Sequence, residues 1–174
     1  LCKISSSLTG DSDTLPFNKL VGENTGLLCL TGGRRGTLAR LITSRQRQTA
    51  ENWVSRLREL FGDRVYIELQ VHSPEDTERC VSLTTLAHRF RIPTVATHDI
   101  HYLTPDQAHL QQVQTAIRLI RPLKEINSTD TAPPEAYFLT PAAMAERMPN
   151  FTQALAATQE IGERCCLELP VGRL

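Results

Sequence analysis

Two short stretches of this chain each contain a carboxylate and a histidine whose spacing along the chain could allow them to bind cations. Asp99 and His101 are separated by one residue and follow residues 92–97, an apolar, β-branched run that predicts a buried strand. Side chains at positions i and i+2 of an extended chain project to the same side, so this pair can converge on one ion. Such a ligand pair suits Zn²⁺, Mn²⁺ or Fe²⁺. A buried Asp–His pair that holds the loop is the alternative.

The second place is residues 64–72, where apolar and polar side chains alternate as they do along a strand. Glu68 and His72 lie on the polar face, about 13 Å apart along an extended chain, so they would serve neighbouring ions more easily than one ion. The alternative is an edge strand whose polar face meets water. His98 is expected on the opposite side of its strand from Asp99, which makes it a weaker ligand candidate.

A glycine-rich turn, Gly32-Gly33-Arg34-Arg35-Gly36, stands between an apolar run at 26–31 and a stretch with helical spacing. Backbone amides at such a turn favour anions, and residues 24–50 contain five arginines and no acid. Arg34 and Arg35 are therefore candidates for contact with phosphate or with a partner. The turn matches neither dinucleotide nor P-loop fingerprint, and a solvated basic surface is the alternative.

These candidate residues need a scaffold, and the order of elements predicts one. Strands are expected near 27–31, 64–71 and 93–97, with helices between them, a helix at 74–90 and another from 104 to about 120. A proline-containing loop at 121–135 precedes helices at 140–148 and 150–166. This alternation predicts an α/β fold with a parallel sheet, whose site residues gather at the carboxyl ends of the strands. So few strands form a small open sheet or part of a barrel.

Composition excludes several classes of protein. The 174 residues are 40% hydrophobic and 22% charged, with formal net charge zero, which disfavours a strongly basic nucleic-acid-binding domain. No apolar run is long enough to span a membrane. Five cysteines without a CxxC motif indicate neither a disulfide framework nor a zinc ribbon, so a reducing cytoplasm is expected. The opening residues lack an initiator methionine and a signal peptide, and we expect a piece of a longer protein.

Several of these motifs occur together, and in the same order, in one known family. The chain resembles the PHP (polymerase and histidinol phosphatase) domain of bacterial DNA polymerase III alpha subunits. The segments that carry the resemblance are 26–36, 66–72, 92–102, 115–118, 137–141, 154–155 and 163–165. The Gly-Gly-Arg-Arg-Gly form of the turn is nearer to the error-prone type of alpha subunit than to the replicative type.

The resemblance implies a distorted β/α barrel of seven units with a cluster of up to three metal ions, Zn²⁺ or Mn²⁺. Asp99 and His101 match the final Asp-x-His metal motif of the family, and Glu68 matches the acid of its Glu-Leu-Gln strand. His72 lies where many members have histidine, and His98 replaces the usual asparagine. The opening His-x-His motif of the family is not in this sequence. Residues 1–120 would then be the second half of the barrel, with 121–174 leading toward the polymerase body.

The function implied by the resemblance is that of a DNA-directed DNA polymerase in replication or translesion repair synthesis. This chain would be an inactive fragment of that parent, with the remainder of the alpha subunit as its partner and with DNA and a proofreading exonuclease subunit as further partners. One alternative is a metal-dependent phosphoesterase or 3′–5′ exonuclease of the PHP class. Another is a catalytically degenerate scaffold that docks the proofreading subunit.

Overall fold

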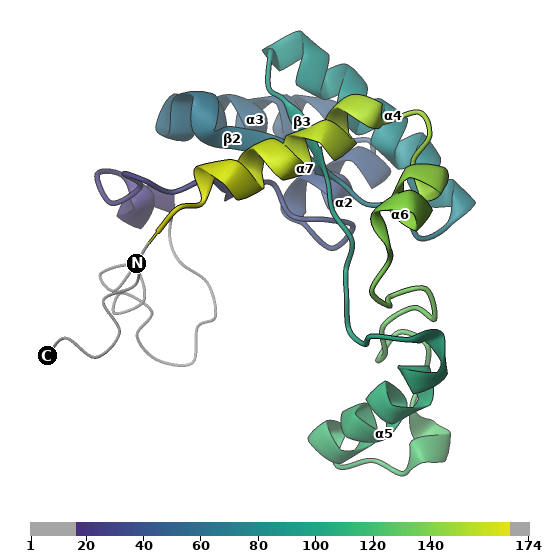
Figure 1. Ribbon diagram of the computed structural model, residues 1–174. Helices are drawn as coiled ribbons and strands as arrows, with labels where there is room; N and C mark the ends of the chain where they lie inside the picture. Colours follow the sequence, from purple (N-terminus) through teal and green to yellow (C-terminus); the bar gives the residue numbers. More distant parts are fainter. Residues whose placement is uncertain (1–16, 168–174) are drawn as a thin grey trace, which may run out of the picture.

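The fold is built on a three-stranded parallel sheet, seen in a computed structural model that describes residues 17–167 (Figure 1). Its strands are β1 (Cys29–Leu30), β2 (Val65–Leu69) and β3 (Thr94–Ala96), in the spatial order β1-β2-β3. Cys29 pairs with Val65, and Ile67 pairs with Thr94. The prediction of an α/β fold with three parallel strands is confirmed. Three strands do not close a barrel, so the seven-unit barrel stays a prediction.

Helices cover both faces of the sheet. On one face lie α2 (Thr37–Thr43), α3 (Arg47–Phe61) and α4 (Pro74–Phe90), packed against the alternate β2 side chains Val65, Ile67 and Leu69. On the other face α7 (Thr152–Arg164) packs against Tyr66 and Val95. This helix lies across the front of the sheet in Figure 1. Because β2 is covered on both sides, nearly all of its side chains are buried.

Local sequence signals explain where the longer helices begin and end. Ser73 and Asp76 form a capping box at the start of α4, with Pro74 at its first position. The helix ends at Arg91, which adopts the left-handed conformation with φ of 53°. Gly62, with φ of 61°, ends α3 in a conformation that favours glycine. The helices expected at 74–90 and 150–166 are thus present, the second as 152–164.

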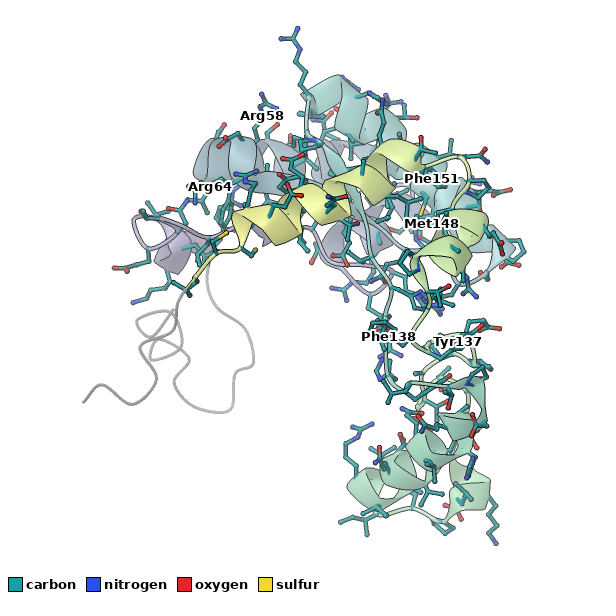
Figure 2. All side chains as sticks on the ribbon, in the orientation of Figure 1. Arg58, Arg64, Tyr137, Phe138, Met148 and Phe151 are labelled. Carbon is teal, nitrogen blue, oxygen red and sulfur yellow. The ribbon has the colours of Figure 1, made fainter. Side chains whose placement is uncertain are left out.

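A helical arm extends away from the sheet. It contains η3 (Pro105–Gln107), α5 (Ala108–Leu119) and η4 (Leu123–Glu125), and α6 (Pro141–Arg147) leads the chain back (Figure 1). At the neck of the arm Tyr102 forms an isolated bridge with Tyr137, and the Phe138 N–H donates to the Tyr102 carbonyl at 3.0 Å (Figure 2). The predicted loop at 121–135 is largely irregular. How the chain divides into domains stays a prediction.

Two short helices, η1 (Phe17–Leu20) and η2 (Gly62–Arg64), complete the secondary structure of the described residues. Across 17–167, every helix is too short or too polar to cross a membrane.

Candidate functional site

β2 is the central strand, and its polar face lies under α7. Tyr66 is 1% exposed; its hydroxyl donates to Glu160 Oε1 at 3.1 Å and accepts from Arg164 Nη1 at 2.5 Å. Burial raises the pKa of the Tyr66 hydroxyl. The alternative of an edge strand facing water is therefore wrong, because a third strand and a helix cover it.

Glu68 is held by neighbouring side chains near the carboxyl end of β2. Its Oε1 accepts hydrogen bonds from Gln70 Nε2 at 3.1 Å and from the hydroxyl of Thr97, just beyond β3. Gln70 Nε2 also lies 3.0 Å from the Thr97 hydroxyl. The Glu68 carboxylate is thus held between β2 and the end of β3 by hydrogen bonds from two uncharged side chains, Gln70 and Thr97.

The glycine-rich turn closes over this network. The Arg34 N–H donates to Gln70 Oε1 at 3.1 Å, and the Gly36 N–H donates to the Gly33 carbonyl at 2.8 Å. Two backbone N–H groups that the turn was predicted to present to an anion therefore donate to other groups of the protein instead. The side chains of Arg34 and Arg35 remain exposed, so contact with a phosphate or partner would depend on their guanidinium groups.

Two histidines stack at the same end of the sheet. The rings of His72 and His98 lie 4.5 Å apart between centroids, with 26° between their planes. His72 is 9% exposed, and neither of its ring nitrogens has a hydrogen-bond partner among the described residues. His98 Nε2 lies 2.9 Å from the Glu135 carbonyl oxygen, whereas its Nδ1 has no partner within residues 17–167.

Both stacked imidazoles are neutral near pH 7. Burial, reinforced by the neighbouring His98 and the guanidinium of Arg34, lowers the pKa of His72 to about 4, although the carboxylates of Asp76 and Asp99 oppose this shift. Burial also lowers the pKa of His98. A neutral imidazole with an unpaired nitrogen is the form that ligates a metal ion.

Asp99 and His101 converge as their spacing predicts. Asp99 Oδ1 lies 3.2 Å from His101 Nε2, and the two side chains are 39% and 38% exposed. The alternative of a buried Asp–His pair is wrong, since both groups reach solvent. The pair lies just after β3, where a ligand from outside can approach it.

The donor set of the described residues fits a metal ion only in part. Glu68, His72, Asp99 and His101 all follow or end parallel strands, yet within 17–167 no three His, Cys, Asp or Glu side chains converge in a metal-binding group. His98 was missed as a partner of His72. No local sequence signal indicates this contact, because it depends on the parallel register that pairs Leu69 with Ala96 and brings the residues just beyond both strands to a similar level.

Comparison with known proteins relates the chain to one group of polymerases. No family model matches it. The chain is 30% identical over 155 residues to the DNA polymerase III subunit alpha of Neisseria meningitidis serogroup A. The aligned region covers 87% of this chain. The chain is 28% identical over 149 residues to the corresponding subunit of Pseudomonas aeruginosa, and 33% identical over 115 residues to error-prone DNA polymerase 3 of Agrobacterium fabrum. These matches cover 85% and 66% of the chain.

The chain is homologous to a segment of the bacterial DNA polymerase III alpha subunits. It spans only 11–14% of the length of these relatives. Relatives named DNA polymerase III subunit alpha and relatives named error-prone DNA polymerase both match, so the similarity does not separate the two types. The roles of Glu68, His72, Asp99, His101, Arg34 and Arg35 stay predictions.

Proposed function

We propose that this chain is a PHP-type segment of a longer DNA polymerase III alpha subunit, a DNA-directed DNA polymerase of replication or translesion repair synthesis. The observation that carries the proposal is the similarity to alpha subunits over 87% of the chain. The parallel sheet, with acidic and histidine side chains at its carboxyl end, agrees with the PHP interpretation. The cytoplasm, where replication takes place in bacteria, is the proposed location.

Primer extension tests this proposal directly. A polypeptide that contains this chain in its natural full-length context should extend a primed DNA template in the presence of deoxynucleoside triphosphates. The chain by itself should leave the primer unchanged, because it spans a small part of the relatives' length. Absence of extension by a folded full-length polypeptide would contradict the proposed polymerase function.

A metal-dependent phosphoesterase or 3′–5′ exonuclease is the second candidate. The observation that favours it is the stacked pair of a buried histidine, His72, and a half-buried one, His98, each with an unpaired ring nitrogen, together with the converging pair Asp99 and His101. Zn²⁺ or Mn²⁺ at such a site would supply an activated water at neutral pH. In that case the converging pair Asp99 and His101 would supply two ligands, and the remaining ligands would come from other parts of the longer polypeptide.

Calorimetric titration of the chain with Zn²⁺ or Mn²⁺ tests the ligand assignment without relying on activity. Asp99→Asn and His101→Gln should each weaken binding about tenfold or more, because a neutral amide is a poorer ligand for these ions than a carboxylate or an imidazole. His88→Gln changes an exposed histidine elsewhere, on α4, and should leave binding unchanged. Equal affinities of all variants would contradict the metal site. We expect no hydrolysis of a phosphodiester by the chain alone, since the described residues lack a three-donor group.

A degenerate scaffold that docks a proofreading exonuclease subunit is the third candidate. The incomplete donor set among residues 17–167 favours it. The full-length polypeptide separates the two alternatives: metal-dependent removal of a 3′-terminal nucleotide, lost in Asp99→Asn, supports the exonuclease. Retained binding of the proofreading subunit without any such hydrolysis supports the scaffold.

A further inference from the structure

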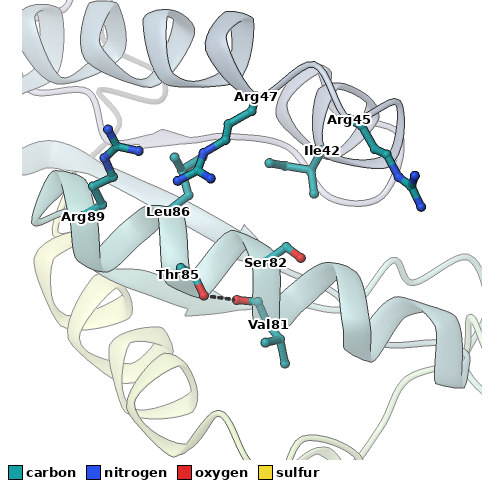
Figure 3. A pocket seen from close by; sticks show the side chains of 8 residues that line it. All are labelled: Ile42, Arg45, Arg47, Val81, Ser82, Thr85, Leu86 and Arg89. Carbon is teal, nitrogen blue, oxygen red and sulfur yellow. Dashed lines mark hydrogen bonds between the residues drawn. The ribbon is translucent and has the colours of Figure 1, made fainter.

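A groove between the α2–α3 corner and α4 is lined by aliphatic side chains and by arginines (Figure 3). Its volume is about 320 Å³. We call the aliphatic lining side chains Ile42, Val81 and Leu86 the floor, and the arginines Arg45, Arg47 and Arg89 the rim. In Figure 3 the Arg47 side chain extends toward α4, whereas Arg45 turns outward from the α2–α3 corner. The groove lies on the face of the sheet covered by α2, α3 and α4, and none of its lining residues is a histidine or an acid.

The rim already binds one carboxylate. Arg47 Nε donates to Glu51 Oε1 at 3.0 Å, and Arg89 Nη1 donates to the same oxygen at 2.5 Å. The Arg45 side chain has no hydrogen bond or ion pair to any residue of the described part, 17–167. With Glu51 as the acid that bridges α3 and α4, the rim keeps an excess of positive charge. Guanidinium groups offer several donors each, so further carboxylates can bind there.

The other lining groups narrow the class of ligand. The hydroxyls of Ser82 and Thr85 donate to backbone carbonyls of their own helix, at 3.2 Å to Glu78 and 3.0 Å to Val81. The guanidinium groups are therefore the side-chain donors of the groove that can still bind a ligand. None of the lining residues is aromatic, so the groove lacks a platform on which a nucleobase could stack. An aliphatic side chain, in contrast, fits a floor of isoleucine, valine and leucine.

We propose that this groove binds an acidic peptide segment of a partner protein, with an aliphatic side chain on the floor and carboxylates on the arginine rim. The positive rim selects the charge of the segment, and the apolar floor selects a leucine-like side chain between its acids. The proposal stands apart from the polymerase and metal hypotheses, because it uses none of their residues.

Fluorescence anisotropy with the complete chain tests the proposal. The probe is a fluorescein-labelled hexapeptide of alternating aspartate and leucine, with aspartate–serine and lysine–leucine hexapeptides as controls. The double variant Arg45→Glu with Arg89→Glu should weaken binding of the aspartate–leucine probe about tenfold or more. Arg118→Glu with Arg121→Glu makes the same change of charge on the arm and should leave the affinity within about twofold.

A second variant covers the case in which loss of the Arg89–Glu51 ion pair unfolds the protein. Val81→Asp changes an exposed floor residue that has no polar side-chain partner to lose, so the helix should stay folded. It should repel the acidic probe and weaken its binding to a similar extent. Both control peptides should bind more weakly than the probe to the unchanged chain.

Three results would overturn the proposal. The first is equal affinity of the probe for the groove variants and the unchanged chain. The second is equal binding of the aspartate–serine peptide, which would show that the floor selects nothing. The third is tighter binding of a single-stranded oligothymidine than of the probe, lost in the Arg45→Glu, Arg89→Glu variant, which would make the groove a nucleic-acid site.

Discussion

Single glycines decide how closely the basic turn approaches the sheet. A Cβ at Gly36 would lie 2.8 Å from the backbone carbonyl group of Gly32 and 2.9 Å from the carbonyl oxygen of Thr31. A Cβ at Gly33 would collide with the end of the Gln70 side chain. The first contact is with backbone, which cannot rotate away, whereas the second is with a flexible side chain.

Alanine substitutions at these glycines should therefore differ in cost. We expect Gly36→Ala to lower the free energy of unfolding by about 1–3 kcal/mol, because residues 31–32 must shift. Gly33→Ala should cost less but should displace Gln70 from its bonds to Arg34 and Glu68. Urea unfolding followed by circular dichroism gives the free energies.

Gly162→Ala is the control for this series. A Cβ there meets nothing within 4 Å, and the residue lies in α7, so alanine should be neutral or stabilise by up to about 1 kcal/mol. A Gly36→Ala protein as stable as Gly162→Ala would show that the turn is looser than this close packing implies.

Cysteine reactivity should separate buried from exposed thiols. Burial raises the pKa of Cys29 to about 11 and raises the pKa of Cys80, whereas Cys165 and Cys166 are exposed. Iodoacetamide reacts with the thiolate, so at pH 8 the folded protein should be alkylated at the two C-terminal cysteines first. Raising the pH toward 11 should increase the thiolate fraction of Cys29.

Peptide mass mapping at several pH values measures each thiol separately. Denaturation in urea is the control, since it should make Cys29 and Cys80 as reactive as Cys165. Rapid alkylation of Cys29 at pH 8 in the native protein would contradict its burial. Cys2 lies outside the described residues, so we predict no order of reactivity for its thiol.

Residue chemistry could be predicted where it depends on local geometry. The convergence of Asp99 and His101 follows from the i, i+2 spacing alone. The stacking of His72 on His98 could not be predicted in that way, because it depends on the register between two strands and on burial of both rings. The fixing of Glu68 by Thr97 has the same cause, since these residues are 29 positions apart.

At the scale of elements, the start of α4 is the feature with the clearest energetic consequence. Asp76 is buried, and its Oδ2 accepts from the backbone N–H groups of His72 at 2.8 Å and Ser73 at 3.0 Å. Its Oδ1 accepts from Arg79 at 2.5 Å. Burial alone would raise the pKa of the carboxyl, but these hydrogen bonds and the Arg79 charge outweigh burial and lower the pKa.

A lowered pKa in the folded state makes the contribution of Asp76 depend on pH. The stabilisation is fully present above the carboxyl pKa of the unfolded chain, near 4, and is lost as the pH falls through the lower folded pKa. We expect Asp76→Asn to lower the free energy of unfolding by about 1–3 kcal/mol at pH 7. The deficit should shrink on acidification, because the carboxyl of the unchanged protein is then protonated too.

Urea unfolding at pH 7, 5 and 3 measures this dependence. Glu78→Gln removes an exposed carboxylate of the same helix and should change stability by less than about 0.5 kcal/mol at each pH. A deficit of Asp76→Asn that stays constant from pH 7 to pH 3 would show that charge contributes nothing to the cap.

Element boundaries were predictable where capping signals are strong and uncertain where packing decides. Ser73, Pro74 and Asp76 mark the start of α4 in the sequence, and the helix begins at Pro74. The position of β2 in the middle of the sheet was not predictable, because its polar alternation is typical of an edge strand. Tyr66 pairs with residues of α7 that are 94 and 98 positions away, which no local pattern shows.

At the scale of the whole molecule, the arm carries several strongly exposed apolar side chains. Ile117 is 72% exposed and Ile120 is 92% exposed, and with Val113 and Leu123 they line an open hollow of about 400 Å³. The outer strands β1 and β3 have only two and three residues, so their free edges offer few unpaired backbone groups. Association of the chain should therefore occur through α5. In the longer polymerase that we propose, the remainder of the alpha subunit would cover this face.

The last prediction follows from this exposed face. The double variant Ile117→Ser with Ile120→Ser should reduce self-association of the chain, because it removes the two most exposed apolar side chains of the arm. Size-exclusion chromatography with light scattering measures the mass over a range of protein concentrations. Val21→Ser changes an exposed apolar residue near η1 and should leave the mass unchanged. If the Ile117→Ser, Ile120→Ser variant associates as strongly as the unchanged chain, another surface mediates the contact, and the exposed apolar side chains of the arm do not indicate packing against the remainder of the alpha subunit.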